Sequence, residues 1–88
     1  MIARKLICHG KVQGVFYRNW TVSTARGLGL TGWVRNRGDG TVEAVLEGDD
    51  AAVEAMIAAM HEGPPRARVD SIECEAVEAM GFTSFERR

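Results

Sequence analysis

The sequence predicts an α+β fold in which two helices cover one face of a four-stranded, largely antiparallel sheet. Segments with apolar residues at every second position alternate with segments of helical period, and turns rich in glycine or proline separate them. The chain has 88 residues, 45% of them hydrophobic and 26% charged, so residues 1–88 are expected to form one globular domain.

The first half of the chain predicts a strand, a helix and a hairpin. Residues 4–12 alternate between apolar and polar side chains, as in a half-buried strand. A helix follows the loop around Gly14, and Gly27 and Gly29 end it. One face of this helix is expected to carry Tyr17, Thr21, Thr24 or Ala25, and Leu28. Strands are predicted over 31–36 and 41–47, with a tight turn between them.

The second half predicts a helix and a strand. Asp49 and Asp50 suit the positive end of a helix, and Pro64 and Pro65 stop it. Its buried stripe is expected to be Val53, Met56, Ile57 and Met60. A strand follows over 69–77, and residues 82–85 could add a short edge strand. The order strand, helix, strand, strand, helix, strand is that of the split βαβ, or ferredoxin-like, two-layer sandwich.

The charges are divided unequally along the chain, although the net charge is −1. Residues 1–38 hold seven basic residues and no acid, whereas residues 39–88 hold all 12 acids and four bases. The basic half indicates a site for a small anion. The alternative is that the two halves intermix in the fold and the asymmetry cancels.

Other classes of function are disfavoured by what the sequence lacks. The pI of about 6.1 and the missing aromatic ribonucleoprotein signature argue against a nucleic-acid partner. No apolar run approaches the roughly 20 residues that span a bilayer, and no signal peptide is visible, so we expect a cytoplasmic protein without a membrane partner. No Cys/His pair has zinc spacing, so no metal or cofactor is expected. Cys8 and Cys74 are expected as two buried, reduced thiols on neighbouring strands, a disulfide between them being the alternative.

The start of the first helix breaks a local rule. No Ser, Thr, Asp or Asn precedes it, and Arg18 places a cation near the positive end of the helix dipole. An anion held by the main-chain N–H groups from Gly14 to Arg18 and by the Arg18 guanidinium would remove this conflict. The alternative is an exposed arginine on a frayed helix. Asn36, at the end of the second strand, can donate and accept hydrogen bonds, but the adjacent Gly-Asp-Gly also suits a turn-forming asparagine.

Several segments resemble the acylphosphatase family over essentially the whole chain. Gly10-Lys-Val-Gln-Gly-Val-Phe-Tyr-Arg18 resembles its first signature, G-x-V-Q-G-V-x-[FY]-R. Gly32-Trp-Val-Arg-Asn36, followed by Gly40-Thr-Val42 and Gly48, resembles the second. The segments Gly63–Val69 and Phe82–Phe85 are similar to the corresponding parts of bacterial members. One departure is Arg37, where members often carry Thr.

This resemblance implies a ferredoxin-like fold and metal-independent hydrolysis of acyl phosphates to a carboxylate and inorganic phosphate, which would be product and inhibitor. It implies Arg18 and Asn36 as catalytic residues, the first binding phosphate and the second positioning water. It also implies a phosphate-binding loop made of Gln13, Gly14, Val15, Phe16, Tyr17 and Arg18. A monomeric enzyme is expected. The alternative is a non-catalytic module that binds phosphate or carbamoyl phosphate, like the acylphosphatase-like domains of larger maturation proteins.

Trp20 and Trp33 are expected to be packing residues rather than parts of a cofactor site.

Overall fold

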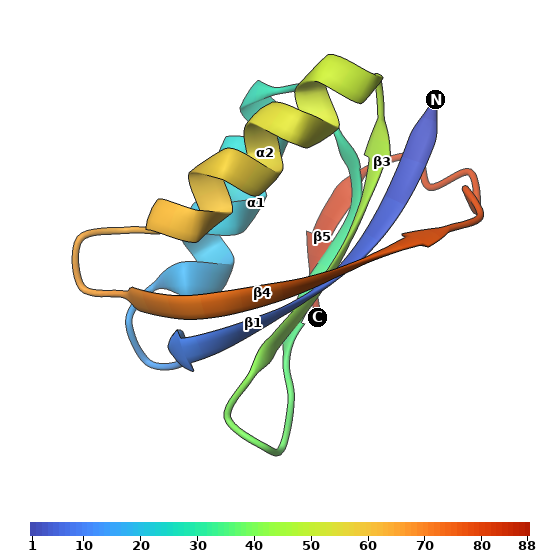
Figure 1. Cartoon of the computed structure of the whole chain (residues 1–88). Coiled ribbons are helices and arrows are strands. Elements are labelled where there is room, and N and C mark those ends of the chain that lie inside the picture. The colour runs from blue at the N-terminus through green and yellow to red at the C-terminus, as the bar shows by residue number, and fades with distance from the viewer.

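The computed structural model describes residues 1–88, and its elements follow the predicted order with one short strand added. They are β1 (Ile2–Lys11), α1 (Tyr17–Gly27), β2 (Thr31–Asn36), β3 (Val42–Gly48), α2 (Asp50–Glu62), β4 (Arg68–Val77) and β5 (Phe85–Arg87). Both helices lie on one face of the sheet and leave the other face bare (Figure 1). The ferredoxin-like two-layer prediction is confirmed. Neither helix has the length and apolar character needed to cross a membrane.

The sheet has the order β4-β1-β3-β2-β5, and only the pairing of β2 with β5 is parallel. The edge strand expected over 82–85 instead starts at Phe85. The reason is the buried Glu47, whose carboxylate accepts hydrogen bonds from the N–H groups of Met80, Gly81 (3.1 Å) and Phe82 (3.2 Å). These donors are turned toward the carboxylate and are not available for pairing with β2.

The core lies between the helices and one face of the sheet. It is formed by alternate strand residues such as Leu6 and Val34, together with the inner faces of both helices. The predicted stripe of α2 is confirmed at Val53, Met56 and Met60, whereas Ile57 is only half-buried. The prediction for Leu28 is wrong, because this residue follows the last turn of α1 and is exposed. The buried residues of α1 are Tyr17, Thr21 and Ala25.

The two cysteines occupy different environments, and both are free thiols. Cys8 is buried in the core, as expected, but Cys74 is exposed, which corrects the prediction that both are buried. Pairing with Leu6 places Cys74 on the same face of the sheet as Cys8, so the difference comes from the position of β4 at the sheet edge, where no further strand covers Cys74. Burial raises the pKa of the Cys8 thiol to about 11, so it stays protonated at neutral pH.

Only one thiol per chain is expected to react rapidly with a thiol reagent in the native protein at pH 8. Cys74 is accessible, whereas Cys8 is both buried and protonated far above that pH. Titration with a chromogenic disulfide before and after unfolding measures this. Cys74→Ser should abolish the fast phase, and a fast phase that survives this substitution would contradict the assigned burial of Cys8.

Candidate active site

The loop between β1 and α1 has an unusual backbone. Gly14 (φ 72°) and Phe16 (φ 69°) are both in the left-handed region, and Phe16 is the only residue other than glycine with positive φ. Phe16 is also the N-cap of α1, where it makes no side-chain capping bond, and the first turn contains no acid. The uncapped helix start expected from the sequence is therefore present.

The main-chain N–H groups from Gly14 to Asn19 donate no hydrogen bond within the protein. All of these residues except Val15 line a cavity of about 130 Å³, together with residues of other elements. Its lining residues are Val12, Gly14, Phe16, Tyr17, Arg18, Asn19, Asn36 and Arg87. Free N–H groups at a helix N-terminus form a favourable environment for an anion. We call this space the cradle.

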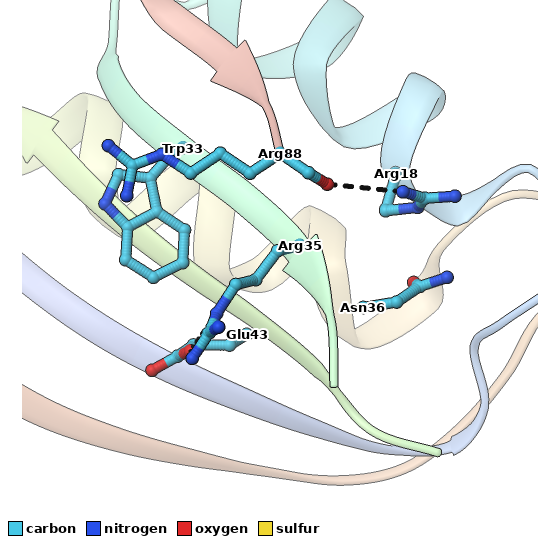
Figure 2. A pocket seen from close by; sticks show the side chains of 6 residues that line it. All are labelled: Arg18, Trp33, Arg35, Asn36, Glu43 and Arg88. Carbon is cyan, nitrogen blue, oxygen red and sulfur yellow. Dashed lines mark hydrogen bonds and ion pairs between the residues drawn. The ribbon is translucent and has the colours of Figure 1, made fainter. Parts of the chain in front are cut away.

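Arg18 and Asn36 come from different elements and line the same two spaces, the cradle and a larger groove beside it. The Arg18 guanidinium donates to the main-chain oxygen of Arg88 (Nη1–O 3.3 Å) and makes no ion pair with a carboxylate. The Oδ1 atom of Asn36 is buried and receives no hydrogen bond from the protein. Figure 2 shows this carboxamide on the same side of the groove as the Arg18 guanidinium. The Arg18 guanidinium and the Asn36 carboxamide thus border one space.

The side chains of the loop anchor it. Gln13 Nε2 donates to the main-chain oxygens of Arg37 (2.8 Å) and Thr41 (2.9 Å) in the hairpin that follows Asn36. Val15 is buried, and Tyr17 is buried with its hydroxyl donating to the Met60 carbonyl (2.7 Å). Burial raises the pKa of Tyr17, so it remains a neutral donor. Of the six predicted loop residues, only Arg18 places a charged side chain at the cradle.

The hairpin turn after Asn36 is held by its own contacts. Asp39 accepts hydrogen bonds from Thr41 N (3.1 Å) and Oγ1 (2.5 Å), which lower the pKa of its carboxyl. Arg37, the position that departs from the family pattern, forms an ion pair with Asp39 (3.8 Å) and lines neither the cradle nor the groove.

Several residues that line the cradle or the groove were not predicted as site residues, among them Arg87, Arg88 and Trp33. Arg87 lines the cradle and donates to Asn19 Oδ1 (3.1 Å). The Arg88 guanidinium lies over the ring of Trp33, 4.7 Å from its centroid. Trp20 packs against the core as expected, but Trp33 does not, because strand alternation places it on the face that no helix covers. The sequence showed Arg87 and Arg88 only as two bases in the acid-rich half. No pattern in the neighbouring residues indicates that β5 returns to the site.

No group of three His, Cys, Asp or Glu side chains gathers in a metal-binding arrangement. The site offers guanidinium groups, main-chain donors and a carboxamide. Such a set is suited to bind and orient an oxyanion, since planar guanidinium groups match phosphate oxygens and preorganised donors stabilise developing negative charge. Fold and site together define a small α+β domain with a pocket whose donors suit an oxyanion.

Comparison with known proteins identifies the family. Residues 4–87 match the acylphosphatase family model, and the chain belongs to the acylphosphatase family. It is 60% identical over 79 residues to the acylphosphatase of Rhodospirillum rubrum, and the match covers 90% of this chain and 87% of that protein. The crystal structure of acylphosphatase from Bacillus subtilis superposes with a TM-score of 0.97 at 32% identity, covering 100% and 99% of the two chains. The protein is accordingly a hydrolase of acyl phosphates.

The same fold also occurs within a larger protein. A full-length HypF structure, in a phosphate- and nucleotide-bound form, matches 99% of this chain at 29% identity with a TM-score of 0.87. The match covers only 12% of the HypF chain.

Replacing Gln13 by Ala is expected to lower the free energy of unfolding by about 1–3 kcal/mol, because two hydrogen bonds to the hairpin are lost. Urea denaturation measures the change. Gln13→Glu fills the same space but presents a carboxylate to two carbonyl oxygens, so it should destabilise at least as much. If Gln13→Glu were as stable as the parent, the tie between loop and hairpin would not exist.

Proposed function

We propose that the protein hydrolyses acyl phosphates without a metal ion, using Arg18 and the loop from Gln13 to Arg18 to hold the phosphoryl group and Asn36 to position water. The observation that carries this proposal is that residues whose N–H groups are free, namely Gly14 and Phe16 to Asn19, line one cavity together with Asn36. A phosphoryl group in this cradle would supply acceptors to donors that the protein leaves free.

The chemistry of the leaving group explains why so few groups are needed. A carboxylate is a weak base, so no general acid has to protonate it when the bond between phosphorus and the acyl oxygen breaks. Phosphoryl transfer then depends on positioning and on charge stabilisation, which one guanidinium and several N–H donors supply. These groups would take the part that a metal ion takes in other phosphoryl-transfer sites.

The attacking water is assigned to Asn36. The Asn36 carboxamide lines both the cradle and the groove, so it can form a hydrogen bond with a water that faces the phosphorus. An asparagine is not a base at neutral pH. The water oxygen would form the new bond to phosphorus, and its proton would pass to a phosphoryl oxygen of the substrate. The products are a carboxylate and inorganic phosphate, and the phosphate should compete with substrate for the cradle.

Arg18→Ala should reduce phosphate release from benzoyl phosphate by at least 10²-fold, because it removes a preorganised donor to the transferring group. Inhibition by inorganic phosphate should disappear with it. Arg18→Lys keeps the charge but loses the planar fork, so it should recover only part of the rate. The variants are assayed with excess EDTA, and the parent is assayed with and without it. A rate that falls on adding EDTA to the parent would contradict the metal-independent mechanism.

Asn36→Ala should lose turnover by a comparable factor while inorganic phosphate still inhibits with a similar constant. The reason is that the carboxamide is assigned to water and not to the phosphoryl group. Asn19→Ala is the comparison, since its Oδ1 is already occupied by Arg87 and its effect should be smaller. Hydrolysis by Asn36→Ala at the parental rate would show that this residue does not position the water.

The rival function is a non-catalytic phosphate- or carbamoyl-phosphate-binding module. The HypF match shows that this fold occurs within larger chains, but it is more distant than the acylphosphatase of Rhodospirillum rubrum, at 29% against 60% identity. Turnover of benzoyl phosphate by the parent decides between the two, because a binding module would be saturated by phosphate without releasing product.

We also propose that residues 1–88 act as one domain and as a monomer in the cytoplasm, with no nucleic-acid or membrane partner. Both proposed catalytic residues, Arg18 and Asn36, line the same two spaces within one chain, so a single chain brings together the residues that the mechanism uses. One sheet edge is also protected, because Arg26 donates two hydrogen bonds to the Phe85 carbonyl of β5 (3.2 and 2.9 Å).

A further inference from the structure

A groove of about 570 Å³ adjoins the cradle on the bare face of the sheet. It is lined by Arg18, Trp33, Arg35, Asn36, Glu43 and Arg88 (Figure 2). Of the cavities in the structure, this groove alone shares both Arg18 and Asn36 with the cradle. If the phosphoryl group lies in the cradle as proposed above, the groove is the adjoining space that can receive the acyl group of the substrate.

The groove contains one carboxylate, and that carboxylate is already neutralised. Glu43 is almost fully buried and forms ion pairs with Arg35 (2.6 Å) and Lys5 (3.6 Å). It is therefore held on the strands and cannot pair with the other guanidinium groups of the groove. Its two cationic partners compensate its charge, so Glu43 does not make the groove repel an anion.

Arg88 is the guanidinium that remains available. It has no carboxylate partner, and it is held over the Trp33 ring by a cation–π contact of 4.7 Å. Its main-chain N–H donates to the Val34 carbonyl (2.8 Å), which fixes the backbone beside β2. Figure 2 shows the side chain running away from Arg18 across the indole, so its charge lies toward the end of the groove remote from the cradle.

We infer that this groove is an acyl-group subsite that prefers acyl phosphates carrying a second anionic group several bonds from the acyl carbonyl, with Arg88 as the residue that binds this anion. The inference rests on the proposed function, because it places the phosphoryl group in the cradle. Trp33 holds the Arg88 guanidinium in place. A dicarboxylic acid with one carboxyl group phosphorylated meets this requirement.

The test compares 4-carboxybenzoyl phosphate with 4-methylbenzoyl phosphate. The two differ by a charged and an uncharged group at the far end of a rigid ring, and the para carboxylate cannot attack its own acyl phosphate. We expect kcat/KM to be at least fivefold higher for the carboxylated substrate, with the difference mainly in KM. Arg88→Gln should bring the ratio of the two kcat/KM values close to one, since a neutral amide replaces the cation.

Arg4→Gln is the matched control, because it removes the same charge from a residue that lines neither the cradle nor the groove. Arg4 lies near the start of β1, paired with Leu46 and Ala76 in the sheet. It should leave the ratio at the parental value. A parental ratio near one, or a high ratio that survives Arg88→Gln, would overturn the subsite while leaving the hydrolase function intact. If the parent turned over neither substrate, the hydrolase function and the subsite would both be overturned.

Discussion

The site depends on a turn that is held in a conformation its residues do not favour. Phe16 has φ 69°, and the left-handed conformation costs about 1–2 kcal/mol for a residue with a Cβ. The residues on either side maintain it, since Val15 and Tyr17 are buried and the Tyr17 hydroxyl donates to Met60. Gln13 fixes the start of the turn on the neighbouring hairpin. The packed core thus stabilises a loop whose N–H groups have no acceptor in the protein.

Strand β2 brings the other parts of the site together. Val34 points into the core, so its neighbours Trp33 and Arg35 lie on the bare face, whereas Asn36 ends the strand and borders both the cradle and the groove. Parallel pairing with β5 places Arg87 and Arg88 beside the same strand end. The buried Glu47 stabilises the crossover that leads to β5, so a carboxylate on the far end of β3 helps to position two arginines at the site.

The local patterns of the sequence were sufficient for the main elements and for the loop. The alternation in β1 and the glycines that end α1 are signals carried by residues close together in the sequence. The uncapped start of α1 could be recognised because Arg18 stands where an acidic residue is usual. The environments of Trp33, Cys74 and Arg88 could not be predicted in this way. Each depends on which face or edge of the sheet is left uncovered, and on the parallel return of β5, which are properties of the assembled sheet. The roles of Arg18 and Asn36 stay predictions.

The placement of charge explains how a chain of net charge −1 can carry the proposed anion site. The acids nearest the site are paired: Glu43 with Arg35 and Lys5, and Asp39 with Arg37. Arg18, Arg87 and Arg88 are left without carboxylate partners around two joined spaces. Two of these three come from the acid-rich half, so the division of charge along the chain is not what makes the site positive. Because exposed charges are screened beyond about 10 Å at 0.1 M salt, an anion in the cradle responds to these guanidinium groups and not to the more distant acids.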